Sequence, residues 1–452
     1  MDKNNQNVIK NVGHLVDLWL PAKIKYGKIP GLSIGIVYEG KLIYSNGFGY
    51  TDLDKKEKVD ENTLYHIASI SKTFTSVAIM QLVDEGKLRL DDKVAEYLDW
   101  FKGKNKNKDS KNITLRQVLS HTSGLFRDGD TSHWETGNFP EDLSASFSPE
   151  SLTLENATGF KYTNYGFSLL GLVIKKVTGL TYDEYVEEHI LKPLKMDSTS
   201  SDFKDSLKNL ATGHGREIPD EERKTFDHYK TNAYAPATGF VSNVSDLARY
   251  LDALTFKSKT KILTREAKKE IMRPHEKTEG DDEYGLGLDI TWEGKKKIIG
   301  HSGGFNGFIT QVLVDPESGI GVIALSNTLD SSAPGIARGI LKLILNELGS
   351  SDHKGKIPSL KKYEGLYRNV WGDTLVVQLG KKLLTFGVRV NWPLKFATIL
   401  EPIKNKKDQF VMKDKSVFDA RDEIGVFDQF KSGKAQRFNS GSMPSKRVSL
   451  KS

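Results

Sequence analysis

Apolar residues recur with two different periods over the first 350 positions, and these periods predict helices and strands. Apolar side chains at every third or fourth position between Val8 and Leu18 predict an amphipathic helix near the N-terminus. The same spacing occurs in four later segments, and Gly86 and Gly179 follow two of them, as is usual at a helix end. The four predicted helices cover residues 71–85, 166–178, 245–254 and 333–347.

Short continuous apolar runs predict strands at both ends of this region. The predicted strands cover residues 32–38, 41–45, 298–299, 309–314 and 321–325. The first two are separated only by Glu39 and Gly40, which predicts a β-hairpin. Because the strands stand at both ends with helices between them, we expect one mixed sheet that is closed by N- and C-terminal strands, and not a run of parallel crossovers. The predicted fold class is α+β.

The sequence changes character after a polar segment with glycine and proline at residues 349–362. Beyond it, short β-rich runs alternate with polar turns about every ten residues, which predicts a small antiparallel barrel. These runs cover residues 374–379, 382–390, 409–412, 416–418 and 425–430. We therefore expect a first domain at 1–348, a linker at 349–362 and an all-β domain at 363–452.

Charge is distributed unevenly along the 452 residues. The net charge is +7, but residues 353–452 alone hold 21 Lys and Arg against 9 Asp and Glu. Few aromatic residues alternate with these cations, which favours a solvated surface and argues against a nucleic-acid partner. Attachment of this basic segment to an anionic polymer or surface is the alternative interpretation.

The composition excludes several classes of site and of protein. The chain has no cysteine, so disulfides, thiolate metal sites and a cysteine nucleophile are excluded. Its apolar runs are far shorter than the ~20 residues that a transmembrane helix needs. The first residues form no apolar signal segment, so we expect a cytoplasmic protein, or an exported one whose leader is absent from this sequence.

A serine and a lysine stand three residues apart at the start of the helix predicted over 71–85. Ser69 and Lys72 would lie on one face, one turn apart, so that the lysine takes or holds the hydroxyl proton. Free amides at the helix start would also favour an oxyanion. The same spacing recurs in polar stretches at Ser201–Lys204, Ser258–Lys261, Ser351–Lys354 and Ser359–Lys362. Only Ser69 precedes the apolar residues of a buried helix, which favours it as a nucleophile.

Two other segments carry chemistry that such a nucleophile needs. Tyr162 and Asn164 precede the helix predicted over 166–178, after a long polar loop at 126–159 that we expect to be a lid or mobile. A tyrosine hydroxyl can shuttle protons, and an asparagine amide can orient a carbonyl group. The sequence GHSGG at 300–304 lies at the edge of a predicted strand, where glycines allow close approach and amides can face a carbonyl oxygen.

The order of these three motifs resembles that of a known superfamily. Ser-x-x-Lys at 69–72, Tyr-x-Asn at 162–164 and His-x-Gly at 301–303 follow one another as in serine β-lactamases and penicillin-binding proteins. The flanks LSHTSGL at 119–125 and YTNYGFSLLG at 162–171 are similar to one branch of it. That branch comprises class C β-lactamases, D-Ala-D-Ala carboxypeptidases, D-aminopeptidases and related esterases. The resemblance implies a mainly antiparallel sheet flanked by helices, together with an all-helical subdomain.

The C-terminal part also resembles a domain found in this branch. The segment YEGLY at 363–367 looks like the start of the lipocalin-like barrel that several of its peptidases and esterases carry. In such relatives the added domain can reach over the active site and help to set specificity or assembly. The resemblance therefore also implies that a homo-oligomer is among the possible partners.

The resemblance implies hydrolysis through an acyl-enzyme, with no metal and no cofactor. Ser69 would be acylated, and Lys72 and Tyr162 would share the work of the general base in a division that the sequence leaves open. Asn164 would bind a carbonyl group of the substrate. His301 would replace the lysine of the usual third motif and act electrostatically and by a hydrogen bond to Tyr162.

The glycine-rich segment would complete the substrate site. Ser302, Gly303 and Gly304 would lie along the substrate, and the backbone amides of Ser69 and Gly304 would form an oxyanion hole. A histidine in the third motif is usual in the carboxypeptidase, aminopeptidase and esterase relatives and unusual in dedicated class C β-lactamases.

The resemblance thus favours a peptidase or amidase for peptides that contain D-amino acids, of the D-Ala-D-Ala carboxypeptidase or D-aminopeptidase type. A carboxylesterase or β-lactamase of the same fold is the alternative within the class. A catalytically idle ligand-binding or scaffold protein is the alternative of another class. The expected partner is a small peptide, ester or β-lactam substrate.

Overall fold

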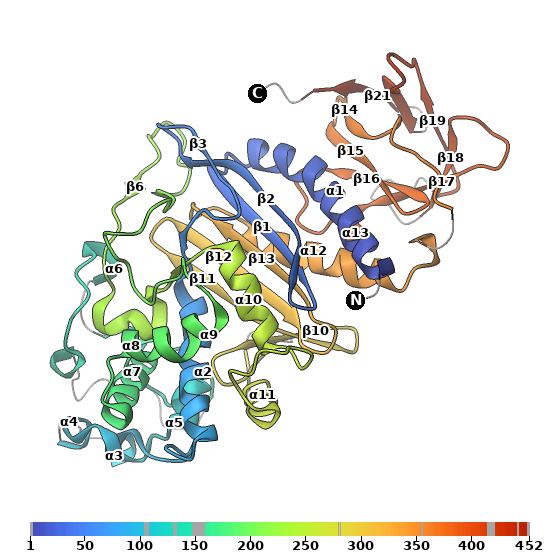
Figure 1. Ribbon diagram of the computed structural model, residues 1–452. Helices are drawn as coiled ribbons and strands as arrows, with labels where there is room; N and C mark the ends of the chain where they lie inside the picture. The colour runs from blue at the N-terminus through green and yellow to red at the C-terminus, as the bar shows by residue number, and fades with distance from the viewer. Residues whose placement is uncertain are drawn as a thin grey trace.

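A nine-stranded antiparallel sheet forms the centre of the first part of the chain (Figure 1). The computed structural model describes residues 3–103, 108–129, 133–146, 159–278, 280, 282–353, 356–413, 421–440 and 443–449. The strand order is β3-β2-β1-β13-β12-β11-β10-β9-β8. The bounds are β1 (Gly31–Tyr38), β2 (Lys41–Asp52), β3 (Glu57–Lys58), β8 (Glu276–Lys277), β9 (Glu283–Tyr284), β10 (Asp289–Glu293), β11 (Lys296–Phe305), β12 (Phe308–Asp315) and β13 (Ile320–Ser326). The predicted α+β class is confirmed.

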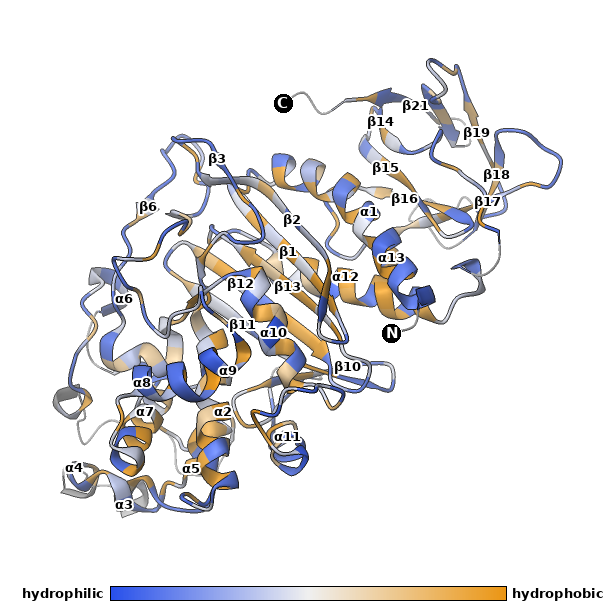
Figure 2. Ribbon diagram, viewed as in Figure 1, coloured by the Kyte–Doolittle hydropathy of each residue, from blue (hydrophilic) through white to orange (hydrophobic). Residues whose placement is uncertain are grey.

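Helices cover both faces of the sheet (Figures 1 and 2). Alternate residues of a strand belong to two separate cores. Val322 and Ala324 of β13 pack with α1 and α12, whereas Ile323 and Leu325 pack with the helices of the other face. The five predicted helices are present as α1 (Lys3–Tyr26), α2 (Ser71–Asp84), α7 (Asn164–Thr178), α10 (Val244–Leu254) and α12 (Ala333–Leu348).

Short elements around α2 and α7 form the predicted helical subdomain. They are α3 (Val94–Tyr97), α4 (Asp99–Gly103), α5 (Leu115–Leu119), α6 (His133–Thr136), α8 (Tyr182–Val186), α9 (Lys192–Leu194) and α11 (Arg265–Ile271). Two short strand pairs join β4 (Tyr65–His66) to β7 (Val241–Ser242), and β5 (Gly213–His214) to β6 (Thr225–Phe226). The loop expected at 126–159 contains α6, while residues 130–132 and 147–158 lie outside the described part of the chain.

The C-terminal part is a closed antiparallel barrel of eight strands. They are β14 (Gly365–Asn369), β15 (Gly372–Leu379), β16 (Lys382–Gly387), β17 (Thr398–Pro402), β18 (Gln409–Lys413), β19 (Ile424–Asp428), β20 (Arg437–Ser440) and β21 (Met443–Val448). The strand predicted over 382–390 ends at Gly387, because the chain then turns towards α13 (Pro393–Phe396). The run predicted at 416–418 lies outside the described residues.

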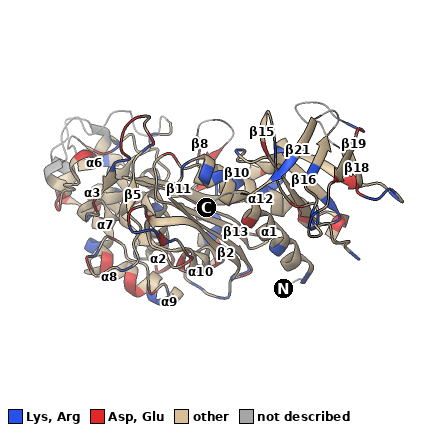
Figure 3. Ribbon diagram, turned by 90° about the horizontal axis from the view of Figure 1, so that it is seen from above, with Lys and Arg blue, Asp and Glu red and all other residues tan. Residues whose placement is uncertain are grey.

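Side chains fill the interior of the barrel, as is usual for a closed barrel of eight strands. The buried interior residues include Tyr363, Tyr367, Val376, Leu383, Leu400, Phe410, Met412, Phe427 and Phe438. The rings of Phe427 and Phe438 stack with their centroids 4.5 Å apart. Lys and Arg residues are spread over the barrel strands, for example along β21 (Figure 3), where Lys446 is exposed. The barrel is therefore a packed unit with a basic surface.

The outer face of β14–β16 rests on the helices α1 and α12 (Figure 1). Leu375 and Val377, which point away from the barrel interior, belong to the same core as these helices. The Trp19 indole of α1 donates a hydrogen bond to the Val388 carbonyl at 3.2 Å. Because α2 lies on the opposite face of the sheet, the barrel does not reach over Ser69 in the way that some relatives would suggest.

No helix in the described ranges combines the length and the apolar content that a membrane crossing requires.

Candidate active site

Ser69 lies in a tight turn that leads into α2. Its predecessor Ala68 has a φ of +53°, a left-handed conformation that is strained for a residue with a side chain. Ser71 stabilises this turn, because its Oγ donates to the Ala68 carbonyl at 2.6 Å and accepts from the Phe240 amide at 3.0 Å. Ala68 and Ile70 are buried while Ser69 is partly exposed, so the turn presents the Ser69 hydroxyl outward.

Lys72 is fully buried one turn further along, next to the Ser69 hydroxyl. Its Nζ lies 3.3 Å from the Ser69 Oγ, 2.6 Å from the Asn164 Oδ1 and 2.8 Å from the Ala237 carbonyl oxygen. Burial lowers the pKa of the Lys72 ammonium well below its ordinary value. In its neutral form the amine can donate its two N–H groups to the two carbonyl oxygens, and its lone pair then faces the hydroxyl of Ser69.

Tyr162 lies on the other side of this pair, immediately before α7. The Lys72 Nζ is 4.7 Å from the centre of its ring. Burial raises the pKa of the Tyr162 phenol, and a hydrogen bond with Ser69 partly opposes that rise. Tyr162 is therefore a neutral phenol at ordinary pH. The structure brings Ser69, Lys72 and Tyr162 together, and both Lys72 and Tyr162 contact the nucleophile.

Asn164 holds its amide between the side chains of Lys72 and Asp128. Its Oδ1 accepts from Lys72, and its Nδ2 donates to the Asp128 Oδ1 at 2.5 Å. The Trp134 indole donates to the same carboxylate oxygen at 2.9 Å. These contacts fix the direction of the Asn164 amide, and one hydrogen of its Nδ2 is left for a substrate carbonyl.

His301 lies near Tyr162 but bonds to a different tyrosine. Its Nδ1 donates to the Ser302 carbonyl at 2.5 Å, and its Nε2 lies 3.0 Å from the Tyr284 hydroxyl. A carbonyl only accepts, so Nδ1 carries the proton and Nε2 accepts from Tyr284. Burial lowers the pKa of the His301 imidazole, which keeps the ring neutral. The predicted hydrogen bond to Tyr162 is wrong, because the Tyr284 hydroxyl and the Ser302 carbonyl are the partners of the two ring nitrogens.

The end of β11 leaves backbone amides without a strand partner on one side. β10 pairs with β11 only as far as Gly300, whereas β12 pairs with it to Phe305. The Ser302 amide donates to the Asp289 Oδ2 at 3.3 Å, on the side away from β12. Alternate amides of an antiparallel strand point the same way, so the Gly304 amide also points away from β12.

Gly303 lets this strand lie directly against the turn that carries Ser69. A Cβ at Gly303 would stand 2.3 Å from the Ile67 carbonyl oxygen and 2.4 Å from the Thr310 Oγ1. Any side chain would force the strand and the turn apart. Gly304 is exposed, so its amide is open to a bound carbonyl oxygen.

Four residues near the site carried no signal in the sequence interpretation as functional groups: His121, Asp128, Tyr284 and Asp289. His121 accepts from the Thr163 amide at 3.1 Å, and its ring lies 4.2 Å from that of Tyr162. It belongs to the segment HTSGL, so the resemblance could have pointed to it. Nothing local distinguishes Asp128 or Asp289 from other surface carboxylates of this charged chain.

The described part of the chain holds no group of three or more His, Asp or Glu side chains arranged to bind a metal ion.

Sequence comparison assigns the chain to a family. The family described as Beta-lactamase matches residues 12–346. The chain belongs to the beta-lactamase family. This match spans the sheet, the helical subdomain and all three motifs, and it ends within the last turn of α12. The resemblance of the motifs to this superfamily is thereby confirmed.

Two curated relatives share the family part of the chain. Protein flp of Staphylococcus aureus (strain MW2) is 30% identical over 339 residues, which cover 73% of this chain and 66% of the relative. Penicillin-binding protein 4* of Bacillus subtilis (strain 168) is 27% identical over 293 residues, 61% of this chain and 63% of the relative. The chain thus spans somewhat less than two thirds of the length of these relatives.

Solved structures share the whole architecture, barrel included. The octameric penicillin-binding protein homologue from Pyrococcus abyssi superposes with a TM-score of 0.65 at 26% identity, over 96% of this chain and 99% of that one. The structure of SurE superposes with a TM-score of 0.61 at 19% identity, over 98% of this chain and 99% of that one. The arrangement of a beta-lactamase-family domain with a C-terminal barrel therefore recurs.

Proposed function

We propose that this protein is a serine hydrolase that forms an acyl-enzyme on Ser69 and cleaves amide bonds in peptides containing D-amino acids. The observation that carries the proposal is the buried Lys72 amine beside the Ser69 hydroxyl, with two carbonyl oxygens taking its N–H groups. A lysine held neutral at this distance can accept the hydroxyl proton and so make a weak nucleophile reactive.

Acylation follows from the positions of these groups. The Ser69 proton moves to the Lys72 Nζ while Oγ bonds to the substrate carbonyl carbon. The carbonyl oxygen, now negative, accepts hydrogen bonds from the amides of Ser69 and Gly304. The carbon–nitrogen bond then breaks, and Tyr162 donates its proton to the leaving nitrogen and recovers one from Lys72. In the alternative route Tyr162, in its deprotonated form, accepts the Ser69 proton in place of Lys72. The variants Lys72→Ala and Lys72→Arg distinguish the two routes.

Deacylation uses the same groups in reverse. A water molecule attacks the acyl carbon and transfers a proton to the base. The ester bond to the Ser69 Oγ then breaks, and Oγ takes the proton from the base to become a hydroxyl again. Asn164 orients the substrate by donating to a carbonyl of its chain. The neutral His301 supports a peptidase in preference to a dedicated β-lactamase, since lysine is the usual residue of the third motif in the latter. The relatives named penicillin-binding proteins support D-amino-acid peptides as substrates.

The test compares two short peptides that differ only in D- or L-alanine at the cleaved bond. We expect the wild-type protein to prefer the D-peptide and Ser69→Ala to lose at least ~10⁴-fold in rate, the scale for removing such a nucleophile. Ser258→Ala is the matched control, because Ser258 has the same spacing to a lysine but lies in the half-buried segment after α10. It should keep full activity.

Covalent labelling gives an independent readout. A serine-reactive phosphonate should label the wild-type protein and Ser258→Ala but not Ser69→Ala. Labelling at another serine would contradict the assignment of the nucleophile. Cleavage of a p-nitrophenyl ester without cleavage of either peptide would instead indicate an esterase, and no turnover of any substrate would indicate an idle protein.

A further inference from the structure

Asp289 carries a half-buried carboxylate at the start of β10, beside the candidate active site. Its Oδ2 accepts a hydrogen bond from the Ser302 amide at 3.3 Å. Among the residues that the structure describes, no Lys, Arg or His lies within ion-pair distance of this carboxylate. A charge that is partly removed from water is costly without a partner of opposite sign. The position of Asp289 therefore favours a cation that is not part of the chain.

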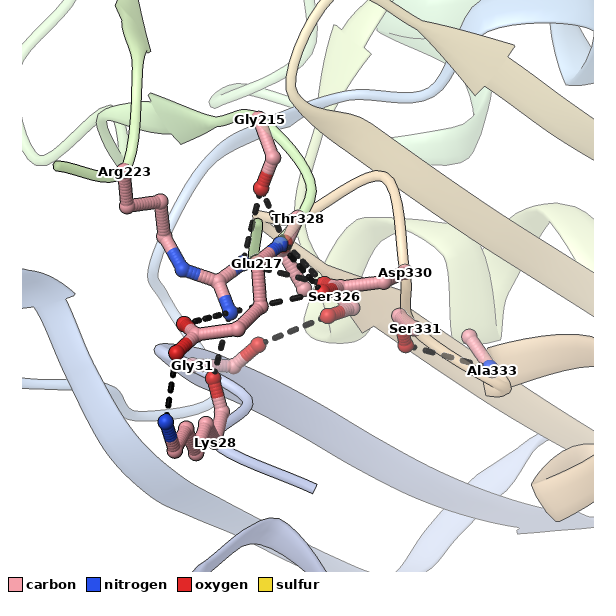
Figure 4. Close-up of polar contacts among 10 residues, drawn as sticks. All are labelled: Lys28, Gly31, Gly215, Glu217, Arg223, Ser326, Thr328, Asp330, Ser331 and Ala333. Atoms are coloured by element: carbon pink, nitrogen blue, oxygen red, sulfur yellow. Dashed lines mark hydrogen bonds and ion pairs between the residues drawn. The ribbon is translucent and has the colours of Figure 1, made fainter. Parts of the chain in front are cut away.

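Carboxylates elsewhere in this protein do have cations beside them, and Figure 4 shows an example. Glu217 and Asp330 share the guanidinium group of Arg223, at 3.0 Å each. Arg223 comes from a segment distant in sequence from Asp330, so the fold itself brings the opposite charges together. Nothing equivalent is supplied to Asp289 by the described part of the chain. This difference distinguishes Asp289 from a carboxylate that only stabilises the fold.

Two basic side chains of the active site do not supply this cation. Burial lowers the pKa of Lys72 well below its ordinary value, and burial also lowers the pKa of His301. The negative charge of Asp289 opposes the shift of the His301 pKa, so its carboxylate is close enough to act on the site. Arg127 is already paired with Asp128 at 3.1 Å. The charge that remains uncompensated at the site, among the described residues, is therefore negative.

The leaving group of the proposed reaction starts beside Tyr162, because this phenol donates a proton to the leaving nitrogen. The ring of His301 lies 6.4 Å from the ring of Tyr162, and Ser302 follows His301 on β11. The Ser302 amide stands two residues, or about 7 Å, from the Gly304 amide that receives the carbonyl oxygen. A charged group about four bonds beyond the scissile carbonyl carbon therefore comes within reach of Asp289.

We propose that Asp289 determines specificity, and that the substrate carries a positively charged amine, and not a free carboxylate, on its leaving group. An ammonium group at this place forms a charge-assisted hydrogen bond with Asp289. The carboxylate of a C-terminal residue would instead meet a like charge there, which is strongly unfavourable. The inference rests on the proposed function for the side on which the leaving group lies. It argues against the D-Ala-D-Ala carboxypeptidase type, whose leaving group is an amino acid with a free carboxylate.

The test uses three substrates with the same acetyl-D-alanyl group and leaving groups of nearly equal size. The leaving groups are D-alanine, D-alanine amide and the diamine in which CH₂–NH₃⁺ replaces the carboxylate of D-alanine. We expect kcat/KM of the wild-type protein to be about 100-fold higher for the diamine than for D-alanine, with the amide between them, because attraction replaces repulsion. Added sodium chloride should reduce this ratio, because salt screens charges that are only partly buried.

Two variants change the charge at this position in steps. Asp289→Asn keeps an oxygen that can accept from the Ser302 amide but removes the charge, so the ratio of diamine to D-alanine should fall close to one. Asp289→Lys should invert the order of the three substrates. Glu293→Gln is the matched control, because Glu293 ends the same strand and its carboxylate pairs with Lys342 at 3.2 Å. It should keep the wild-type order.

Binding to Ser69→Ala, measured by calorimetric titration with the same three compounds, separates this inference from the proposed function. The diamine should bind most tightly, and Asp289→Asn in the Ser69→Ala background should remove the preference. A wild-type protein that cleaves none of the compounds, while Ser69→Ala still prefers the diamine, would overturn the proposed function and support recognition of a cation by Asp289. Cleavage without a preference for the diamine would overturn the inference alone. Equal binding of the three compounds to Ser69→Ala, or no binding, would overturn it as well.

Discussion

The two β-structures of this chain differ in how they use their backbone. In the nine-stranded sheet, β11 continues for five residues beyond the end of its pairing with β10, so the Gly304 amide has no strand neighbour on that side. In the barrel every strand has a neighbour on both sides. A closed barrel has no open edge, and an open edge is where backbone donors remain for a ligand. The candidate chemistry accordingly lies in the sheet.

The interior near Ser69 and the interior of the barrel also differ in the kind of side chain that they bury. Around Ser69 the first part of the chain buries Lys72, Asn164 and His301, each no more than 3% exposed. The barrel buries rings instead, such as Phe410 and Phe427. Burying polar groups is costly unless they are hydrogen-bonded, so their concentration at one place indicates a functional site. The barrel contributes packing and surface, and the predictions below test this division.

The largest effect should come from the polar interior. We expect Lys72→Ala to lower kcat/KM by about 10²- to 10⁴-fold, the range for a positioned base. Lys72→Arg should lose as much, because a guanidinium keeps its proton at any working pH. The wild-type rate should rise with pH as Lys72 loses its proton, with a midpoint well below the ordinary lysine value, because burial lowers its pKa. A loss smaller than tenfold in both variants would make Tyr162 the principal base.

A substitution in the aromatic interior of the barrel should lower the stability of the protein and leave the catalytic rate unchanged. Phe427→Ala removes a ring that is 1% exposed and should lower the free energy of unfolding of the barrel by about 3–5 kcal/mol. Phe430→Ala, at a site that is 41% exposed, is the control and should change it by less than about 0.5 kcal/mol. Chemical denaturation measures both. A fall in kcat of folded Phe427→Ala would break the division between the two regions.

The close approach of β11 to the Ser69 turn should be sensitive to a single methyl group. Gly303→Ala places a Cβ 2.3 Å from the Ile67 carbonyl oxygen and should destabilise the folded protein by about 1–3 kcal/mol. At Gly304 a Cβ would be 3.7 Å from its nearest neighbour, so Gly304→Ala should cost less stability. Thermal unfolding compares the two variants. Equal stabilities would mean that the strand and the turn separate easily.

The smallest effect should appear where the barrel meets α1. The hydrogen bond to Glu364, at 3.0 Å, raises the pKa of the His14 imidazole above its ordinary value. This contact therefore stabilises the folded protein below pH 6.5 and loses that contribution as the pH rises through the raised pKa. His14 is 41% exposed, so we expect less than about 1 kcal/mol. Denaturation of His14→Gln should match the wild-type protein at high pH and fall below it under acidic conditions; a difference independent of pH would contradict this.

The sequence alone determined those parts of the molecule that depend on near neighbours. The spacing of Ser69 and Lys72 sets both side chains on one face of a helix, and they are hydrogen-bonded in the structure. The five predicted helices of the first part and its central strands follow from apolar periodicity, which is a local property. The short polar strands β17, β20 and β21 carry little such periodicity, and the sequence interpretation did not contain them.

Only the tertiary structure decided what surrounds these residues. Burial lowers the pKa of Lys72, and the residues that bury and contact it are distant in the sequence. They include Asn164, 92 positions away, and Ala237, 165 positions away. Tyr284 displaces Tyr162 as the partner of His301, and Asp128 fixes Asn164. Contacts at such separations depend on which surfaces pack together, and no local pattern encodes that. The same holds for the barrel, whose position against α1 and α12 follows from the apolar outer faces of β14–β16.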